Sequence, residues 1–145
     1  MKGYQFYQDH AHEWRWRLID AHENIVATAG EGYNEKSECE KGAALFTTLG
    51  PDAPVKKIKE YDGTGSGDGP EWKYFEDKAL KWRWHFQARN NKIIAACVKG
   101  FEDESAVKKE IEHVKVLLRE IGREKGGNTY TPPAAGGAIS GGRFA

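Results

Sequence analysis

The sequence predicts an α+β fold of two tandem β3-α-β repeats, joined in one antiparallel sheet with both helices packed on one face. The first observation is a tripeptide that occurs twice, as Trp14-Arg15-Trp16 and as Trp82-Arg83-Trp84, 68 residues apart. The second is that many flanking residues keep this offset without a gap. The identical pairs include Asp9 with Asp77, Ala27 with Ala95, Gly32 with Gly100 and Leu49 with Leu117. A duplication at fixed spacing defines the architecture before any single element is assigned.

Repeat size is the third observation. Each repeat spans only about 60 residues, and a unit of that size is marginally stable by itself. The chain of 145 residues carries 5 Trp, 6 Tyr and 6 Phe, which supply a large apolar area. We therefore expect two repeats, 1–62 and 71–131, that share a core. A Gly-rich linker (63–70) joins them, and a Gly/Pro/Ala-rich tail (132–145) follows, expected to be mobile unless a partner orders it.

The first repeat is expected to begin with a three-stranded meander. Aromatic residues predict a strand over 3–9, the Trp-Arg alternation predicts a second over 13–19, and an apolar run predicts a third over 25–29. Polar turns separate these strands, and Asn24 tolerates the left-handed geometry that a turn requires.

A helix is expected next, from about residue 35 to 48. Its apolar positions recur at helical spacing, at Cys39, Ala43, Phe46 and Leu49. Asn34 is the expected N-cap, and Gly50-Pro51 ends the helix. The charged stretch 55–61 then predicts a short strand at or near a sheet edge.

The second repeat follows the same order. Strands are expected over 71–76, 81–88 and 92–98, and a longer helix from Glu102 or Asp103 to about Gly122. Residues 128–131 predict a short closing strand that matches the one after the first helix.

Alternation in the second strand of each repeat separates two faces. Trp14, Trp16 and Leu18, and likewise Trp82, Trp84 and Phe86, lie on the face that the helices should cover. The four tryptophans are therefore expected to be mostly buried. Arg15 and Arg17, and their counterparts Arg83 and His85, lie on the opposite face, toward solvent or a partner.

Composition narrows the classes of protein. The 22 basic and 22 acidic residues argue against binding nucleic acid through bulk charge, although a local patch remains compatible with them. No run of about 18 apolar residues is present, and the N-terminus lacks the apolar core of a signal peptide. A cytoplasmic protein is the expectation, with Cys39 and Cys97 as reduced thiols at positions that are not equivalent in the two repeats.

Sequence motifs that would indicate catalysis, cofactor binding or metal binding are weak. We expect no catalytic, cofactor-binding or metal-ligating residues. His10, His12 and His22 fall in predicted turns and are interpreted as solvated. The glycines of 63–69 lack the lysine of a phosphate-binding loop. The sequence therefore favours a non-enzymatic binding or assembly module. The rival is an enzyme with a site at the seam between repeats, which a concave pocket there with two or more titratable residues would favour.

Two sets of residues are candidates for partner binding. Arg15, Arg17, Arg83 and His85 form an arginine-bearing sheet face, which suits a protein partner or single-stranded nucleic acid, either RNA or DNA. The alternative is a solvated face whose arginines pair with nearby carboxylates. Arg143 and Phe144 are anchors in the tail that would dock on a partner or another subunit; the alternative is a disordered solubilising end.

The succession of strands, turns and helix resembles the YegP-like family of small prokaryotic proteins. The residues that carry the resemblance are Glu13-Trp14-Arg15-Trp16-Arg17-Leu18, Asn24-Ile25-Val26-Ala27-Thr28, Gly32-Tyr33 and the helix with Lys36, and in the second copy Lys81-Trp82-Arg83-Trp84, Lys92-Ile93-Ile94-Ala95 and Gly100-Phe101. It covers residues 3 to about 122; His85-Phe86 and the longer second helix depart from it, and the tail has no counterpart. The resemblance implies repeats that join in one sheet and exchange their last strands. It implies no established activity.

Overall fold

The computed structural model describes residues 2–59, 69–89 and 92–124. The predicted closing strand 128–131, the tail 132–145 and all of the linker except Gly69 and Pro70 lie outside these ranges. The described strands are β1 (Gly3–Gln8), β2 (Trp14–Ile19), β3 (Ile25–Ala29), β4 (Val55–Lys57), β5 (Glu71–Glu76), β6 (Trp82–Gln87) and β7 (Ile93–Ala96). The helices are α1 (Lys36–Leu49) and α2 (Glu104–Glu124), and a short 3-10 helix, η1 (Gly50–Asp52), follows α1.

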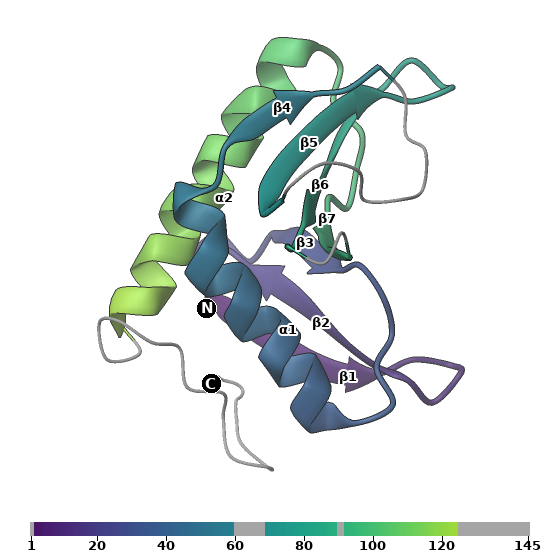
Figure 1. Cartoon of the computed structure of the whole chain (residues 1–145), viewed down its shortest axis with the longest axis vertical. Coiled ribbons are helices and arrows are strands. Elements are labelled where there is room, and N and C mark those ends of the chain that lie inside the picture. The colour runs from purple at the N-terminus through teal and green to yellow at the C-terminus, as the bar shows by residue number, and fades with distance from the viewer. Residues whose placement is uncertain (1, 60–68, 90–91, 125–145) are drawn as a thin grey trace.

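The seven strands form one sheet in the order β1-β2-β3-β7-β6-β5-β4 (Figure 1). Each repeat contributes an antiparallel meander, and the two meanders meet where β3 pairs antiparallel with β7. Small residues allow this close seam, with Thr28 opposite Ala96 and Ala29 opposite Ala95. A side chain at Gly30 would collide with the backbone carbonyl of Ile93, so glycine is needed there. The predicted fold class of two joined repeats is confirmed.

Strand β4 leaves its own repeat and covers the far edge of the other. It runs parallel to β5, with Val55 opposite Trp72 and Lys57 opposite Tyr74. The backbone N–H of Trp72 donates to the Pro54 carbonyl at 2.8 Å, and the backbone N–H of Ile58 donates to the Tyr74 carbonyl at 2.9 Å. The strand exchange that the resemblance implies is confirmed for the first repeat, and β4 is the charged edge strand that its sequence predicts.

The prediction of a purely antiparallel sheet is wrong at this edge. Strand β4 pairs parallel with β5, whereas the other strand pairs of the described sheet are antiparallel. The helix start also differs from its prediction. Glu35, with φ −117°, is the N-cap of α1 and makes no side-chain capping bond, so Asn34 is not the cap.

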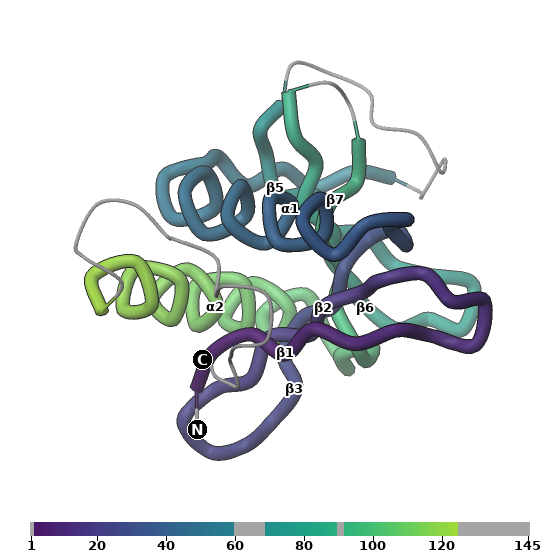
Figure 2. The backbone as a smooth tube through the Cα atoms, turned by 90° about the horizontal axis from the view of Figure 1, so that it is seen from below, coloured from purple at the N-terminus to yellow at the C-terminus, as the bar shows by residue number. Residues whose placement is uncertain are grey.

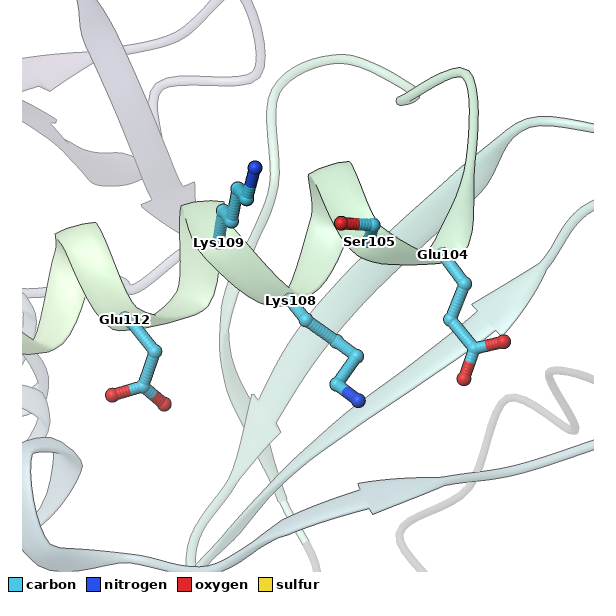
Figure 3. Close-up of a pocket in the computed structure, with 5 residues that line it drawn as sticks. All are labelled: Glu104, Ser105, Lys108, Lys109 and Glu112. Carbon is cyan, nitrogen blue, oxygen red and sulfur yellow. The ribbon is translucent and has the colours of Figure 1, made fainter.

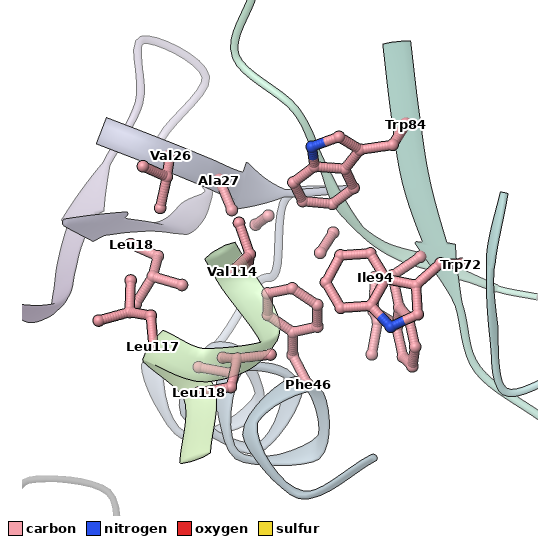
Figure 4. Close-up of a cluster of buried hydrophobic side chains, with 14 of the residues drawn as sticks. Leu18, Val26, Ala27, Phe46, Trp72, Trp84, Ile94, Val114, Leu117 and Leu118 are labelled. Carbon is pink, nitrogen blue, oxygen red and sulfur yellow. The ribbon is translucent and has the colours of Figure 1, made fainter. Parts of the chain in front are cut away.

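Both helices pack against the tryptophan face, as predicted, and lie next to each other in Figure 2. Phe46 of α1 occupies the centre of the core, with its ring centroid 5.6 Å from that of Trp16, 5.5 Å from Trp72 and 5.3 Å from Phe86 (Figure 4). One helix of the first repeat thus packs against strands of both repeats. The two repeats therefore share a single core, which meets the stability need of units this small.

Burial of the repeated tryptophans follows their position in the strand. Trp16 and Trp84 are fully buried, as predicted, whereas Trp14 and Trp82 are half-buried at the margin of the core. Lys36 lies 5.5 Å from the ring centroid of Trp14, and Lys57 lies 5.4 Å from that of Trp82. Among the described residues, neither helix has an apolar stretch long enough to cross a membrane.

Candidate functional site

The surface of the sheet opposite the helices carries most of the predicted binding residues, and we call it the outer face. In the first repeat it presents Gln5, Tyr7, Arg15, Arg17 and Thr28; the equivalent residues of the second repeat are Lys73, Phe75, Arg83, His85 and Ala96. The structure therefore places Arg15, Arg17, Arg83 and His85 on one side of the sheet. Predicted anchors Arg143 and Phe144 lie outside the described residues.

Arg15 and Arg83 are bound by carboxylates of their own hairpins. Arg15 Nε donates to Asp9 Oδ2 at 2.7 Å, and Arg83 Nε donates to Asp77 Oδ2 at 2.6 Å. The other carboxylate oxygen, Oδ1, accepts two backbone N–H groups of the turn in each repeat, at 2.8 and 3.0 Å for Asp9 and at 2.9 and 3.0 Å for Asp77. Each aspartate thus joins the turn to the second strand, and we call this contact the hairpin ion pair.

The pKa values of the two aspartates agree with these ion pairs. The Arg15 guanidinium, helped by the Glu13 and Ala11 backbone N–H groups, lowers the pKa of Asp9. The Lys81 backbone N–H and then the Arg83 guanidinium lower the pKa of Asp77. Two of the three predicted arginines are therefore neutralised locally, as the solvated-face alternative expects. Their first role in this fold is to fix the hairpins.

Arg17 has a different environment. Its guanidinium carbon lies 4.3 Å from the ring centroid of Tyr7, a cation–π contact. Within the described ranges, the carboxylates that pair with arginines on this face belong to Arg15 and Arg83, and none pairs with Arg17. Gln5 lies directly opposite Arg17 on β1, and Thr28 lies directly opposite it on β3. These three polar side chains form a row across three strands.

Three residues of the second-repeat outer face, Lys73, Phe75 and His85, are buried, whereas Arg83 and Ala96 are half-buried; this corrects the expectation that His85 faces solvent. His85 is 3% exposed, and its neighbours on β5 and β6 are equally buried. These neighbours are Glu71, Lys73, Phe75 and Gln87. The His85 ring lies 5.6 Å from that of Phe75, at the positions that Arg17 and Tyr7 occupy in the first repeat. Equivalent positions on the outer faces of the two repeats therefore differ in exposure.

Two buried charged residues on this face, Glu71 and Lys73, were missed by sequence reasoning; they form a charge cluster with the exposed Lys56. Glu71 Oε1 lies 3.7 Å from Lys56 Nζ, and its Oε2 lies 3.9 Å from Lys73 Nζ. Alternation in the segment EWKYFE assigns Glu71 and Lys73 to the face away from Trp72, where charged residues usually meet water. Local pattern therefore gives the face correctly, but it carries no signal that this part of the face is buried.

The four residues that pair β3 with β7 at the seam carry no titratable side chain. They are Thr28, Ala29, Ala95 and Ala96. A cavity of about 690 Å³ lies instead along the first half of α2, lined by Glu104, Ser105, Lys108, Lys109 and Glu112 (Figure 3). Lys109 points away from Lys108 and Glu112 in that view, and Glu104 already accepts bonds from Tyr74 at 3.0 Å and from Lys57 at 3.2 Å. The lining groups do not converge on one point.

Among the described residues, the cysteines and the candidate metal ligands do not form a nucleophilic or metal-binding site. Burial raises the pKa of the Cys39 thiol to about 12 and also raises that of Cys97, so neither is a thiolate at neutral pH. In the described part of the chain, no group of three or more His, Cys, Asp or Glu side chains is placed to hold a metal ion. His10, His12 and His22 are exposed in turns.

Sequence comparison places this architecture in a known class of small proteins. The family model described as a domain of unknown function, DUF1508, matches residues 9–56 and 77–117, one match in each repeat. The chain belongs to this family. It is 36% identical over 55 residues to the UPF0339 protein NMB1088 of Neisseria meningitidis serogroup B, and to NMA1193/NMA1859 of serogroup A; the match covers 38% of this chain and 96% of each relative. Those relatives are therefore about one repeat long.

Solved structures agree on the fold. The solution NMR structure of the UPF0339 protein SO3888 from Shewanella oneidensis superposes with a TM-score of 0.60 at 17% identity, over 78% of this chain and 80% of that one. The solution NMR structure of yegP from E. coli, titled a protein of unknown function, gives 0.59 at 18% identity, over 81% and 87%. The YegP-like resemblance is thus confirmed.

Proposed function

We propose that this protein is a non-enzymatic binding module that contacts a protein partner through the first-repeat outer face. The observation that carries the proposal is the contrast between two equivalent surfaces. Gln5 is exposed and its neighbours are half-exposed, whereas the equivalent Lys73 and His85 are buried. One face of a sheet whose other face forms the core is thus left available for a ligand.

Several features support a protein partner over nucleic acid. Nucleic-acid affinity grows with the number of phosphates that free cations neutralise. Here the hairpin ion pairs neutralise Arg15 and Arg83, and the whole chain carries formal net charge +0. A surface of mixed charge with an aromatic side chain suits a protein interface.

Nucleic acid remains the second candidate because of one contact. Arg17 stacked on Tyr7 is an arrangement on which a base can stack, as in proteins that bind single strands. Such binding would weaken steeply with salt.

The rival enzyme proposal is less well supported. The seam is lined by small residues, and both cysteines are protonated thiols. The free state of both cysteines agrees with a reducing compartment, and the cytoplasm is where we would look for the partner.

The test is capture from native lysate with the full chain as bait, with and without nuclease. Gln5→Trp places a bulky uncharged side chain on the first-repeat outer face, and Thr48→Trp places the same side chain on the exposed surface of α1. We expect wild type and T48W to retain the same proteins in the presence of nuclease, and Q5W to lose them. Equal capture by all three would refute the proposal, and loss with nuclease would favour nucleic acid.

An arginine double substitution is a poor probe here. Replacing Arg15 and Arg83 with glutamate would place like charges beside Asp9 and Asp77 and disrupt both hairpins. Loss of binding in that variant would not separate a surface effect from a folding effect.

A further inference from the structure

We infer that Arg17, with Gln5 and Thr28 on either side, forms a binding site for a carboxylate side chain of the protein partner. This inference rests on the proposed function, because it names the chemistry by which the first-repeat outer face would hold its partner. It concerns a segment rich in Glu or Asp that lies across the three strands β1, β2 and β3.

The register of the strands builds the site. Gln5, Arg17 and Thr28 are direct cross-strand partners, so their side chains leave the same face about 4.8 Å apart, the spacing of neighbouring strands. Each supplies hydrogen-bond donors: an amide NH2, a guanidinium fork and a hydroxyl. An oxyanion above Arg17 therefore has donors on three adjacent strands.

Tyr7 prepares Arg17 for this role. The 4.3 Å contact between guanidinium carbon and ring centroid restricts a side chain that otherwise has many rotamers. A restricted side chain loses less entropy when it binds, and a planar fork suits bidentate contact with a carboxylate. The contact leaves the hydrogen-bonding edge of the guanidinium, rather than its face, as the part that recognises an anion.

A carboxylate should bind at Arg17 because the other basic side chains of the outer face that were predicted to bind a partner are paired with aspartates or buried. Arg15 and Arg83 are held by Asp9 and Asp77, at 2.7 and 2.6 Å. The counterpart of Arg17 in the second repeat is His85, which is 3% exposed. The duplicated chain thus presents this kind of site in its first repeat and has replaced it in the second.

The charge around the site favours a carboxylate over a phosphate backbone. Asp9 and Glu13 lie beside Arg15 on the same hairpin, with Glu13 Oε1 4.0 Å from Arg15 Nη2. A nucleic-acid strand that ran along β2 past Arg17 would place a phosphate beside these carboxylates. A peptide that crosses β1, β2 and β3 at the row of Gln5, Arg17 and Thr28 can place a carboxylate on Arg17 without approaching them, and a charge-assisted pair of this kind is about twice as strong as a neutral hydrogen bond.

The experiment is an NMR titration of the full ¹⁵N-labelled chain with defined probes. The probes are acetylated hexaglutamate, acetylated hexaglutamine and the oligonucleotide (dT)6. With hexaglutamate we expect shifts of the Arg17 Nε–H, the Gln5 side-chain amide and the Thr28 backbone amide. Hexaglutamine should shift none of them.

Variants assign the effect to the guanidinium. Arg17→Gln should weaken hexaglutamate binding by about tenfold or more, the loss of one charged hydrogen-bonded pair. Arg17→Lys keeps the charge without the fork and should restore only part of the affinity. Arg123→Gln removes an equal charge from the exposed end of α2 and should leave binding unchanged.

The outcomes separate this inference from the proposed function. Shifts at Gln5 and Thr28 with an unmoved Arg17 Nε–H, or equal binding by R17Q, would overturn the carboxylate site while the face itself still binds. No shift on this face with hexaglutamate would also overturn it, and the lysate capture with Q5W would then decide the proposed function by itself. Tighter binding of (dT)6 than of hexaglutamate would replace the carboxylate with phosphate.

Discussion

The two repeats have kept one face of their sheet alike and let the other diverge. On the core face the equivalent pairs remain large or small together: Trp16 and Trp84, Leu18 and Phe86, Ala27 and Ala95, all buried. The hairpin ion pairs are also the same in both, with matching donors and nearly equal distances. On the outer face, Gln5, Arg17 and Thr28 stand where the second repeat has Lys73, His85 and Ala96.

This contrast shows which parts of each repeat are constrained by folding. The core face and the hairpins are needed by each repeat for folding, so equivalent positions stay chemically alike. The outer face is not part of the shared core, and its exposure differs between the copies: in the second repeat Lys73, Phe75 and His85 are buried, and in the first the equivalent positions meet solvent. Four sets of substitutions test this difference between the repeats.

The largest effect is expected at the shared core. Phe46→Ala removes a fully buried ring that packs on Trp16 of one repeat and on Trp72 and Phe86 of the other. We expect a loss of about 3–5 kcal/mol in the free energy of unfolding. Tryptophan fluorescence and far-ultraviolet circular dichroism in urea should report one coincident transition, because both repeats depend on this side chain.

The neighbouring residue is a matched control for the core. Leu45 lies next to Phe46 on α1 and is 40% exposed, so Leu45→Ala should change stability by about 0.5 kcal/mol at most. Two separate transitions in the Phe46→Ala variant, one for each repeat, would contradict a single core.

The next effect tests the strand exchange. Ile58→Pro removes the N–H that donates to the Tyr74 carbonyl at 2.9 Å, whereas Ile58→Ala keeps it. A lost hydrogen bond of this kind costs about 1 kcal/mol. Hydrogen exchange should speed up in β5 and β6 of the second repeat and stay unchanged in β1 and β2, although residue 58 belongs to the first repeat in sequence. Faster exchange in β1 and β2 instead would mean that β4 supports its own repeat.

The hairpin ion pairs should respond to acid alike. Their aspartates have folded pKa values below the ordinary 3.8, so their stabilisation is present above about pH 4 and is lost as pH falls through the lowered pKa. Asp9→Asn and Asp77→Asn should each lower Tm at neutral pH, by similar amounts. The double variant should show a smaller drop in Tm between about pH 5 and pH 2 than wild type. An effect at one aspartate alone would show that the two hairpins are not equivalent.

The smallest effect concerns the hairpin turns. Leu80 and the equivalent His12 both have positive φ, 64° and 63°, a conformation that costs most side chains about 1–2 kcal/mol. Replacing either with glycine relieves this cost but adds entropy to the unfolded chain, so each variant should gain at most about 1 kcal/mol. Thermal unfolding checks this. A clear loss of stability in Leu80→Gly would mean that its 70% exposed side chain has a structural contact that geometry does not reveal.

Periodicity in the chain was enough for most of the fold. The duplicated Trp-Arg-Trp motif placed β2 and β6 and identified the covered face, and helical spacing placed Phe46 in the core. The hairpin ion pairs agree with the solvated-face alternative, in which the arginines pair with nearby carboxylates, and their residues recur in the sequence: Asp9 and Arg15 correspond to Asp77 and Arg83 at the common offset. A conserved spacing of opposite charges across a turn is readable from sequence.

Long-range arrangement was not readable in this way. Alternation assigned His85 to the outer face correctly, but whether another segment buries that face depends on the whole chain. The direction of β4 is set by its pairing with β5, a strand of the other repeat, which local pattern does not encode. The candidate site was therefore predicted as a face and resolved only by the structure into neutralised arginines, a buried histidine and Arg17.

We propose that the first-repeat outer face is a binding surface and that its second-repeat counterpart is not. Hydroxyl-radical footprinting of the full chain, in buffer and after capture of its partners from native lysate, tests it most directly at Tyr7 and Phe75. We predict that Tyr7 is modified in buffer and protected after capture, while Phe75, 7% exposed, is modified little in either state. Unchanged modification of Tyr7 in the captured complexes would contradict the claim.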